Sequence, residues 1–266
     1  LDPPLHHAGG DGHAAQLTFR CAGARRVVDL AARIDDARHQ FALPDAIDQR
    51  SAFLRQRPQI ARGVGARLID IGADAVKTGM LHSAGTIETV ARVLGSQAPD
   101  VPLVVDPVMV AKGGARLIDE TAVDAMKAHL FPRASVITPN LPEAAALLGS
   151  AEIADVAAME EAGRALLAFG PRAVLMKGGH LPGDQVSDLL ITKGGMSRYD
   201  GPRIESRDTH GTGCTLASAI ASGLAQGLAL SDAVAAARAY VTRAIESAPG
   251  LGHGHGPLNH MYGLTP

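Results

Sequence analysis

The chain has 266 residues, 46% of them hydrophobic and 20% charged, which is enough to bury one large core, and we expect a single domain over residues 1–266. The formal net charge of -2 argues against a nucleic-acid partner, because such proteins usually carry a basic stripe on one face. No apolar run reaches the roughly 18 residues that cross a bilayer, so we expect no membrane partner.

The cysteines and the first residues bear on where the protein works. Cys21 and Cys214 lie far apart and form no CxxC pair, so we expect neither a structural zinc site nor a disulfide framework. Two separate cysteines with no expected disulfide are typical of proteins in a reducing compartment. The opening Leu1-Asp2-Pro3-Pro4 lacks the basic and then apolar plan of a signal peptide. We therefore expect a cytoplasmic protein.

Along the chain, the first 66 or so residues show no convincing strand rhythm. From about Ile71 onward, short β-branched runs alternate with longer Ala/Leu-rich runs, as in βα units around a mostly parallel, buried sheet. The expected strands are Ala73–Thr78, Pro102–Asp106, Ala134–Thr138, Ala173–Lys177 and Ser187–Thr192. The expected helices are Thr86–Ser96, Glu120–His129, Pro142–Leu148, Val156–Phe169, Thr215–Gly227 and Ser231–Ser247, the last with Ser231 as its N-cap.

Four polar residues stand at or just past the carboxyl ends of these strands: Lys77, Asp106, Asn140 and Lys177. In open α/β sheets ligands bind outside those ends, so this placement predicts an active site. Every strand must leave the core somewhere, and loop polarity alone explains any one of the four. Four such residues in register favour a site.

The run from Asp208 to Ile220, DTHGTGCTLASAI, predicts an anion-binding turn. Gly211 and Gly213 permit backbone shapes closed to other residues, and the helix that follows would point its first free N–H groups at the turn. A thiol in the first turn would feel the positive end of the helix dipole, so we expect the pKa of Cys214 to fall below about 8.5. The alternative is a plain Gly-rich turn with a buried cysteine that acts as a small hydrophobe.

Two carboxylates are candidates for organising Mg²⁺. Asp106 follows the apolar run Leu103-Val104-Val105, and Mg²⁺ in phosphoryl-transfer sites is held by one or two carboxylates plus phosphates. An Asp-Pro turn is the structural alternative. Asn140 and Glu143 fit a helix capping box, which needs no function, but Glu143 would also lie beside Asp106 if their strands are neighbours.

Lys177 offers a point charge for a phosphate at a strand end, before two glycines. An exposed loop lysine is the alternative. The P-loop pattern is absent, so another phosphate cradle is needed, and the turn before Cys214 can supply it. An anion-binding turn, two carboxylates, a lysine and a thiol together indicate phosphoryl transfer to a hydroxyl, a reaction that depends on positioning and charge neutralisation.

At this point the chain resembles the hydroxymethylpyrimidine/phosphomethylpyrimidine kinases of thiamine biosynthesis, in the ribokinase-like superfamily. The resemblance covers about Asp70 to the C-terminus, so that residues 67–266 match well and residues 1–66 poorly. It rests on the motifs KTGML at 77–81, DPVM at 106–109, TPNLPEA at 138–144, LMKGGH at 175–180 and THGTGCT at 209–215, with the tail GHGHGP at 252–257 and His260.

The resemblance implies a three-layer αβα sandwich that uses ATP and Mg²⁺. It implies two successive phosphorylations, first of 4-amino-5-hydroxymethyl-2-methylpyrimidine and then of its monophosphate. It also implies site roles: Cys214 as the base; Gly211, Thr212 and Gly213 as the anion hole; Asp106 and Glu143 toward the metal; Asn140, Lys177 and Thr209 toward ATP; and Met80 and Gln49 toward the pyrimidine. Relatives imply a homodimer.

The N-terminal residues depart from the family, which leaves alternatives open. The family's AGSD-like turn and GIQADLKT-like helix are matched only by weak counterparts around Gly9 and Gln16. A pyridoxal-type kinase of the same superfamily and a non-catalytic ATP-binding homologue therefore stay as rival hypotheses. The histidines His253, His255 and His260 lie in a glycine-rich setting without a completing carboxylate or cysteine, so we interpret them as part of a flexible surface tail and not as a metal site.

Overall fold

The computed structural model describes residues 18–21, 25–30, 68, 72–109 and 118–263. Within these ranges one sheet of eight strands is ordered as the strands occur along the chain, β1 to β8. Neighbours from β2 to β6 pair in parallel, whereas β1–β2, β6–β7 and β7–β8 pair antiparallel. The strands are β1 (Thr18–Cys21), β2 (Arg25–Leu30), β3 (Ala75–Thr78), β4 (Leu103–Val105), β5 (Val136–Ile137), β6 (Ala173–Met176), β7 (Gln185–Thr192) and β8 (Gly195–Pro202).

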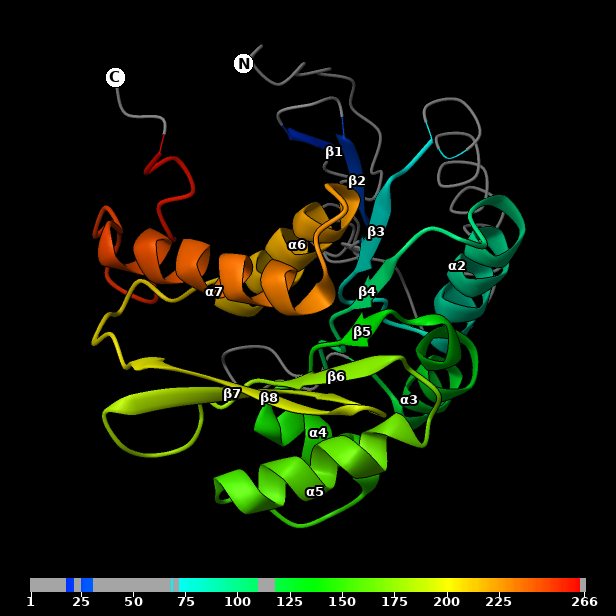
Figure 1. Ribbon diagram of the computed structural model, residues 1–266, viewed down its shortest axis with the longest axis horizontal. Coiled ribbons are helices and arrows are strands. Elements are labelled where there is room, and N and C mark those ends of the chain that lie inside the picture. Colours follow the sequence, from blue (N-terminus) through cyan, green and yellow to red (C-terminus); the bar gives the residue numbers. More distant parts are fainter. Residues whose placement is uncertain (1–17, 22–24, 31–67, 69–71, 110–117, 264–266) are drawn as a thin grey trace, which may run out of the picture.

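Helices pack on both faces of this sheet, so the predicted three-layer αβα fold is confirmed (Figure 1). Helices α2 to α5 connect consecutive parallel strands and lie on one face, as right-handed crossovers in a constant direction require. Helices α6 and α7 lie on the other face. The helices are α2 (Ala84–Gln97), α3 (Glu120–Ala125), α4 (Leu141–Leu148), α5 (Val156–Leu167), α6 (Thr212–Ala225) and α7 (Leu230–Glu246).

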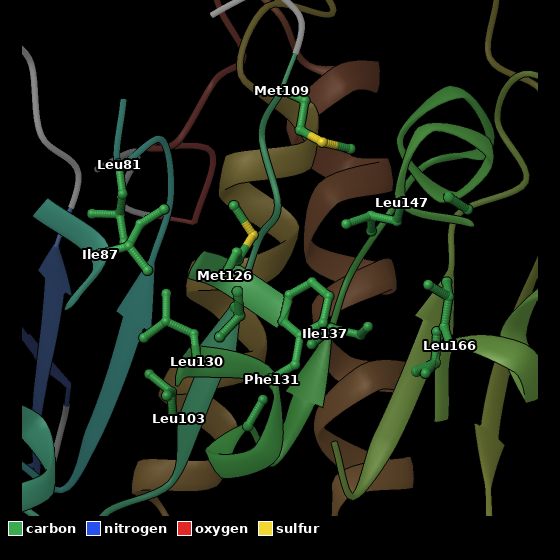
Figure 2. Close-up of a cluster of buried hydrophobic side chains, with 14 of the residues drawn as sticks. Leu81, Ile87, Leu103, Met109, Met126, Leu130, Phe131, Ile137, Leu147 and Leu166 are labelled. Carbon is green, nitrogen blue, oxygen red and sulfur yellow. The ribbon is translucent and has the colours of Figure 1, made fainter. Parts of the chain in front are cut away.

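The strands divide their side chains between two hydrophobic cores. Leu103 and Val105 of β4 belong to the core beneath α2 to α5, whereas Val104 between them belongs to the core beneath α6 and α7. This alternation follows from the two-residue period of a strand. Figure 2 shows part of the first and larger core, in which Phe131 and Ile137 are fully buried. Burial on both faces explains why the strands read as short, continuous apolar runs.

The observed elements differ from the expected ones where local chemistry is weak. The expected helix 120–129 is α-helical only to Ala125 and continues as a π-helical turn, Met126–Leu130, and a 3₁₀ turn, Phe131–Arg133. Helix α7 begins at Leu230, and its N-cap is Ala229 without a side-chain hydrogen bond, so the N-cap prediction for Ser231 is wrong. Strands β1 and β2 lie within the first 66 residues, where no strand rhythm was found, and were not predicted. Strand β8 was not predicted either, because most of its residues are exposed polar residues or glycines on a sheet edge.

In the described ranges no helix is both long and apolar enough to cross a membrane. Gln49, expected in the pyrimidine pocket, lies outside the described residues, as do the weak N-terminal counterparts of the family motifs before residue 18.

A test of the larger core is the substitution Phe131→Ala. Because the ring is fully buried and lies 6.5 Å from the Phe169 ring, its removal leaves a cavity and is expected to lower the free energy of unfolding by about 3–5 kcal/mol. Urea unfolding measures the loss, and Met261→Ala, at a position 62% exposed, is the control that should change it by less than about 0.5 kcal/mol. Equal stability of the two variants would contradict this packing.

Candidate active site

The carboxyl ends of β4, β5 and β6 bring the predicted polar residues to one edge of the sheet. Asp106 follows β4 directly, Asn140 lies three residues after β5, and Lys177 follows β6. Val105 pairs with Ile137, Ile137 with Val174, and Asn140 forms a further parallel bridge with Lys177. Parallel pairing thus confirms that these residues lie side by side.

Lys177 joins two carboxylates at this edge. Its Nζ lies 3.0 Å from Asp106 Oδ1 and 3.9 Å from Glu143 Oε2. The side chain of Asp106 is only 1% exposed and that of Lys177 14%, so the ion pair is largely shielded from water. Asp106 Oδ1 also accepts a hydrogen bond of 3.1 Å from the hydroxyl of Thr138, a buried residue at the end of β5 that the sequence reasoning did not assign to the site.

Asn140 and Glu143 form the capping box that begins α4. Glu143 N–H donates to Asn140 Oδ1 at 2.9 Å, and Asn140 N–H donates to Glu143 Oε2 at 2.8 Å. The structural interpretation of this motif is therefore correct. It does not compete with the site interpretation, because the same Glu143 oxygen that caps the helix faces Lys177. The box fixes the position of the carboxylate relative to Asp106.

The charges in this cluster shift each other's pKa values. Burial raises the pKa of Glu143 to about 7, and Asp106 adds to the rise, while Lys177 and the backbone N–H groups of Asn140 and Met109 oppose it. Burial alone would lower the pKa of Lys177, but the charges of Asp106, Glu143 and Cys214 outweigh it and raise that pKa. Lys177 is therefore a permanent cation at neutral pH.

The turn that the sequence predicts to bind an anion lies at the N-terminus of α6. Gly211 is the N-cap with φ +84°, a left-handed conformation that favours glycine, and no side chain caps the helix. Thr212, Gly213 and Cys214 form its first turn, where backbone N–H groups have no acceptor within the helix. The hydroxyl of Thr212 donates to Thr209 O at 2.8 Å, which closes the turn before the helix.

This helix terminus meets the ionic cluster. A Cβ built on Gly213 would stand 3.2 Å from Lys177 Nζ, so the ammonium lies directly against the backbone of the first turn. The charge of Cys214 acts on Lys177, and the thiol is exposed. The alternative of a cysteine buried as a small hydrophobe is therefore wrong. Met80 lies two residues beyond β3 at the same edge of the sheet and is half-buried.

The residues present fit Mg²⁺ bound partly through phosphates. Asp106 and Glu143 offer hard carboxylate oxygens, the donors that Mg²⁺ prefers. Among the described residues no group of three or more histidines, cysteines or carboxylates could hold a metal ion by itself. A cation here would therefore take its other ligands from water and from a phosphorylated substrate.

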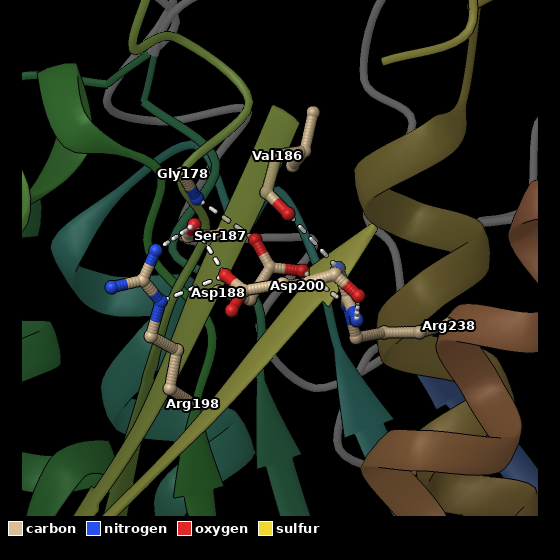
Figure 3. Close-up of polar contacts among 7 residues, drawn as sticks. All are labelled: Gly178, Val186, Ser187, Asp188, Arg198, Asp200 and Arg238. Atoms are coloured by element: carbon tan, nitrogen blue, oxygen red, sulfur yellow. Dashed lines mark hydrogen bonds and ion pairs between the residues drawn. The ribbon is translucent and has the colours of Figure 1, made fainter. Parts of the chain in front are cut away.

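A second polar network holds the loop after Lys177. The N–H of Gly178 donates to Asp188 Oδ1 at 2.8 Å, and Arg238 Nε donates to Asp188 Oδ2 at 2.8 Å, so a buried carboxylate links the loop to α7 (Figure 3). Arg203 adds hydrogen bonds to the carbonyls of Gly179 at 2.9 Å and Gly183 at 2.7 Å. Asp188 and Arg203 carry no family signature that the sequence reasoning used, so these supports were missed.

The closeness of this loop to β7 can be tested with adjacent glycines. A Cβ on Gly178 would overlap the backbone carbonyl oxygen of Ser187, whereas a Cβ on Gly179 would meet nothing within 4 Å. Gly178→Ala is expected to lower the free energy of unfolding by roughly 1–3 kcal/mol, and Gly179→Ala by less than about 1 kcal/mol. Thermal unfolding of the two variants measures the difference, and a Gly179→Ala variant that is the less stable would refute the placement.

The raised pKa of Glu143 makes a prediction about pH and stability without divalent metal. The native protein holds this proton up to about pH 7, whereas a glutamate of the unfolded chain releases it near pH 4.5. The stability that the proton contributes is therefore complete below pH 4.5 and is lost as the pH rises from there through 7. Relative to Glu143→Gln, the wild-type chain should lose about 3 kcal/mol of unfolding free energy between pH 4.5 and 8. Urea unfolding in EDTA across this range measures it; parallel pH profiles would contradict the shift.

Comparisons with known sequences agree with this site. Residues 50–259 match the family model described as phosphomethylpyrimidine kinase. The chain is 52% identical over 202 residues to the thiamine biosynthesis bifunctional protein ThiED of Geobacter sulfurreducens, covering 76% of this chain and 41% of that protein. It is 50% identical over 196 residues to the hydroxymethylpyrimidine/phosphomethylpyrimidine kinase of Streptomyces coelicolor, covering 73% and 71%. The chain thus spans less than half of the bifunctional relative.

Solved structures share the fold. The crystal structure of phosphomethylpyrimidine kinase from Clostridium difficile matches with a TM-score of 0.62 and 38% identity over 71% of this chain and 76% of that one. Pyridoxal kinase from Staphylococcus aureus in complex with ADP matches with a TM-score of 0.69 and 28% identity over 92% and 80%. The family match covers the strand-end cluster and the first turn of α6 together, and the chain belongs to the phosphomethylpyrimidine kinase family of ribokinase-like phosphotransferases.

Proposed function

We propose that the chain is an ATP-dependent kinase that phosphorylates 4-amino-5-hydroxymethyl-2-methylpyrimidine and then its monophosphate, for thiamine biosynthesis. The observation that carries the proposal is the position of Lys177, whose ammonium contacts Asp106 and lies against the first turn of α6. A fixed cation between carboxylates and the first-turn amides of a helix suits a phosphoryl group in transfer. The names of the relatives supply the substrate class.

In this proposal the first turn of α6 binds the phosphoryl group. The amides at Gly211, Thr212 and Gly213 would donate to its oxygens, and the helix dipole would favour the negative charge. Lys177 would neutralise charge on the phosphates of ATP. Asn140 and Thr209 are assigned to the nucleotide side of the site. The turn is preorganised by the hydrogen bond from Thr212 to Thr209, so little reorganisation is needed when charge develops.

Cys214 is proposed to take the proton of the alcohol. As the third residue of α6 its thiol is exposed beside Lys177, and both the helix terminus and the ammonium favour a thiolate. The hydroxymethyl oxygen then attacks the terminal phosphorus of ATP while its proton passes to the sulfur, and ADP leaves. Met80 and Gln49 are assigned to the pyrimidine.

Asp106 and Glu143 are the residues that would hold Mg²⁺, directly or through water. When bound, this ion neutralises negative charge on the ATP phosphates. Asp106 is fixed by Thr138 and Lys177, and Glu143 by the capping box, so neither carboxylate needs to move to be available. We further propose that the protein is a homodimer in the cytoplasm, a compartment that supplies ATP and keeps the Cys214 thiol reduced.

The substitution Cys214→Ala tests the proposed base. Loss of a positioned base is expected to lower kcat by roughly 10²–10⁴ with little change in ATP affinity, and Cys214→Asp should recover part of the loss because a carboxylate also accepts a proton. Steady-state kinetics and ATP binding by calorimetry measure the two effects. An alanine variant with wild-type kcat would remove the thiol from the mechanism.

The substrate is tested in a coupled assay with the hydroxymethylpyrimidine and pyridoxal side by side. The proposal expects turnover of the pyrimidine with a kcat/KM at least about tenfold above that of pyridoxal, a difference of roughly 1.4 kcal/mol in transition-state binding. A higher kcat/KM for pyridoxal would favour the rival hypothesis of a pyridoxal-type kinase, a class that shares the fold at 28% identity. ATP binding without turnover of either alcohol would favour a non-catalytic homologue.

A further inference from the structure

The C-terminal tail lies against the approach to the anion-binding turn. The N–H of His210, the residue before Gly211, donates to Gly256 O at 3.1 Å, and His210 forms a parallel bridge with Pro257. Gly256 is buried, although residues 251–255 before it are exposed. Sequence reasoning assigned these residues to a flexible tail, but residues 256 and 257 are docked on the segment that enters α6.

The tail is in turn held by the end of α7. Asn259 N–H donates to Ala244 O at 2.9 Å, and Asn259 Nδ2 donates to Ser247 O at 3.1 Å. The hydroxyl of Tyr240 donates to His260 O at 3.0 Å, and the side chain of Leu258 is buried. The tail therefore connects one fixed element, α7, to the segment that enters α6.

Gly256 is packed too closely for any side chain. A Cβ built there would overlap Asp208 Oδ1, lie 2.8 Å from Asp208 Cγ and lie 2.9 Å from Leu251 O. Asp208 is three residues before Gly211, so its displacement would act directly on the backbone that leads into the first turn of α6. At Gly254, two residues earlier in the same tail, a Cβ meets nothing within 4 Å.

We propose that Gly256 is a positioning residue for phosphoryl transfer: the tail fixes Asp208 and His210, and through them aims the first-turn amides and the thiol of Cys214. The proposal rests on the proposed function for its kinetic consequence, but the geometric claim stands on the contacts of Gly256. The helix has no side-chain cap. The tail contacts the entering segment, which also has local hydrogen bonds from Asp208 N–H to Ser206 Oγ and from the Thr212 hydroxyl to Thr209 O. A small shift of the entering segment would misalign all the donors together.

The kinetic test compares Gly256→Ala with Gly254→Ala, two identical changes two residues apart. Misplacement of catalytic groups by about 1 Å costs on the order of 10²-fold in rate, so Gly256→Ala is expected to lower kcat by roughly 10–10²-fold with KM for ATP changed far less. Gly254→Ala is expected to keep wild-type kcat. Both are assayed well below their melting temperatures and per folded molecule; equal kcat values in the two variants would overturn the proposal.

A rescue separates positioning from general damage to the fold. Because the Gly256→Ala clash falls mainly on the Asp208 carboxylate, adding Asp208→Ala should remove most of the overlap. The double variant is expected to have a higher kcat than Gly256→Ala alone, which is the non-additivity that contacting residues show. A double variant that is slower than either single variant would contradict the contact.

Alkylation of Cys214 by iodoacetamide gives a readout that does not depend on turnover. Thiolate character governs this reaction, so a displaced helix terminus in Gly256→Ala should slow alkylation at neutral pH, whereas Gly254→Ala should react at the wild-type rate. Mass spectrometry of the Cys214 peptide separates it from Cys21. Wild-type protein without kinase activity would contradict the proposed function but would not affect the comparison of alkylation rates. An unchanged alkylation rate in Gly256→Ala would overturn the positioning role.

Discussion

The contact between the Lys177 ammonium and its neighbours is the constraint that joins the two halves of this molecule. Asp106 comes from the end of β4, Glu143 from the start of α4 on one face of the sheet, and Gly213 from the start of α6 on the other face. Removing one partner of such a shielded cluster leaves an uncompensated charge. The end of β4 and the starts of α4 and α6 are therefore constrained to meet at this point. Because β4, β5 and β6 are parallel neighbours, their carboxyl ends bring Asp106 and Lys177 to the same edge of the sheet.

Backbone geometry, more than side chains, completes the site. Gly178 accepts no side chain because Ser187 O lies against it, Gly211 adopts a left-handed conformation, and Gly256 is closed by Asp208. Gly178 and Gly256 thus lie where another segment leaves no room for a side chain, whereas Gly211 supplies the left-handed turn before α6. The chain thereby holds the first-turn amides of α6 and a cation in fixed places before substrate arrives, and fixed dipoles stabilise charge that develops during a reaction.

Much of this could be predicted from the sequence, because strands buried on both faces leave apolar runs and their polar ends are easy to find. The adjacency of Asp106, Asn140 and Lys177 followed from the parallel order, and Cys214 followed from the glycines before it. The supports provided by Thr138, Asp188 and the tail could not be found, since they depend on contacts across 32, 10 and about 46 residues that no local pattern records. Edge strand β8 was missed because its sequence has no alternation of apolar and polar residues.

The most direct test of the account is a crystal structure of the protein with Mg²⁺ and a non-hydrolysable ATP analogue. The account predicts the terminal phosphate within about 3.2 Å of the first-turn amides of α6 and of Lys177 Nζ, the range of ordinary hydrogen bonds. It predicts the metal on the side of Asp106 and Glu143. Terminal phosphate bound away from the α6 terminus, with Lys177 still closed on its carboxylates, would contradict the central claim.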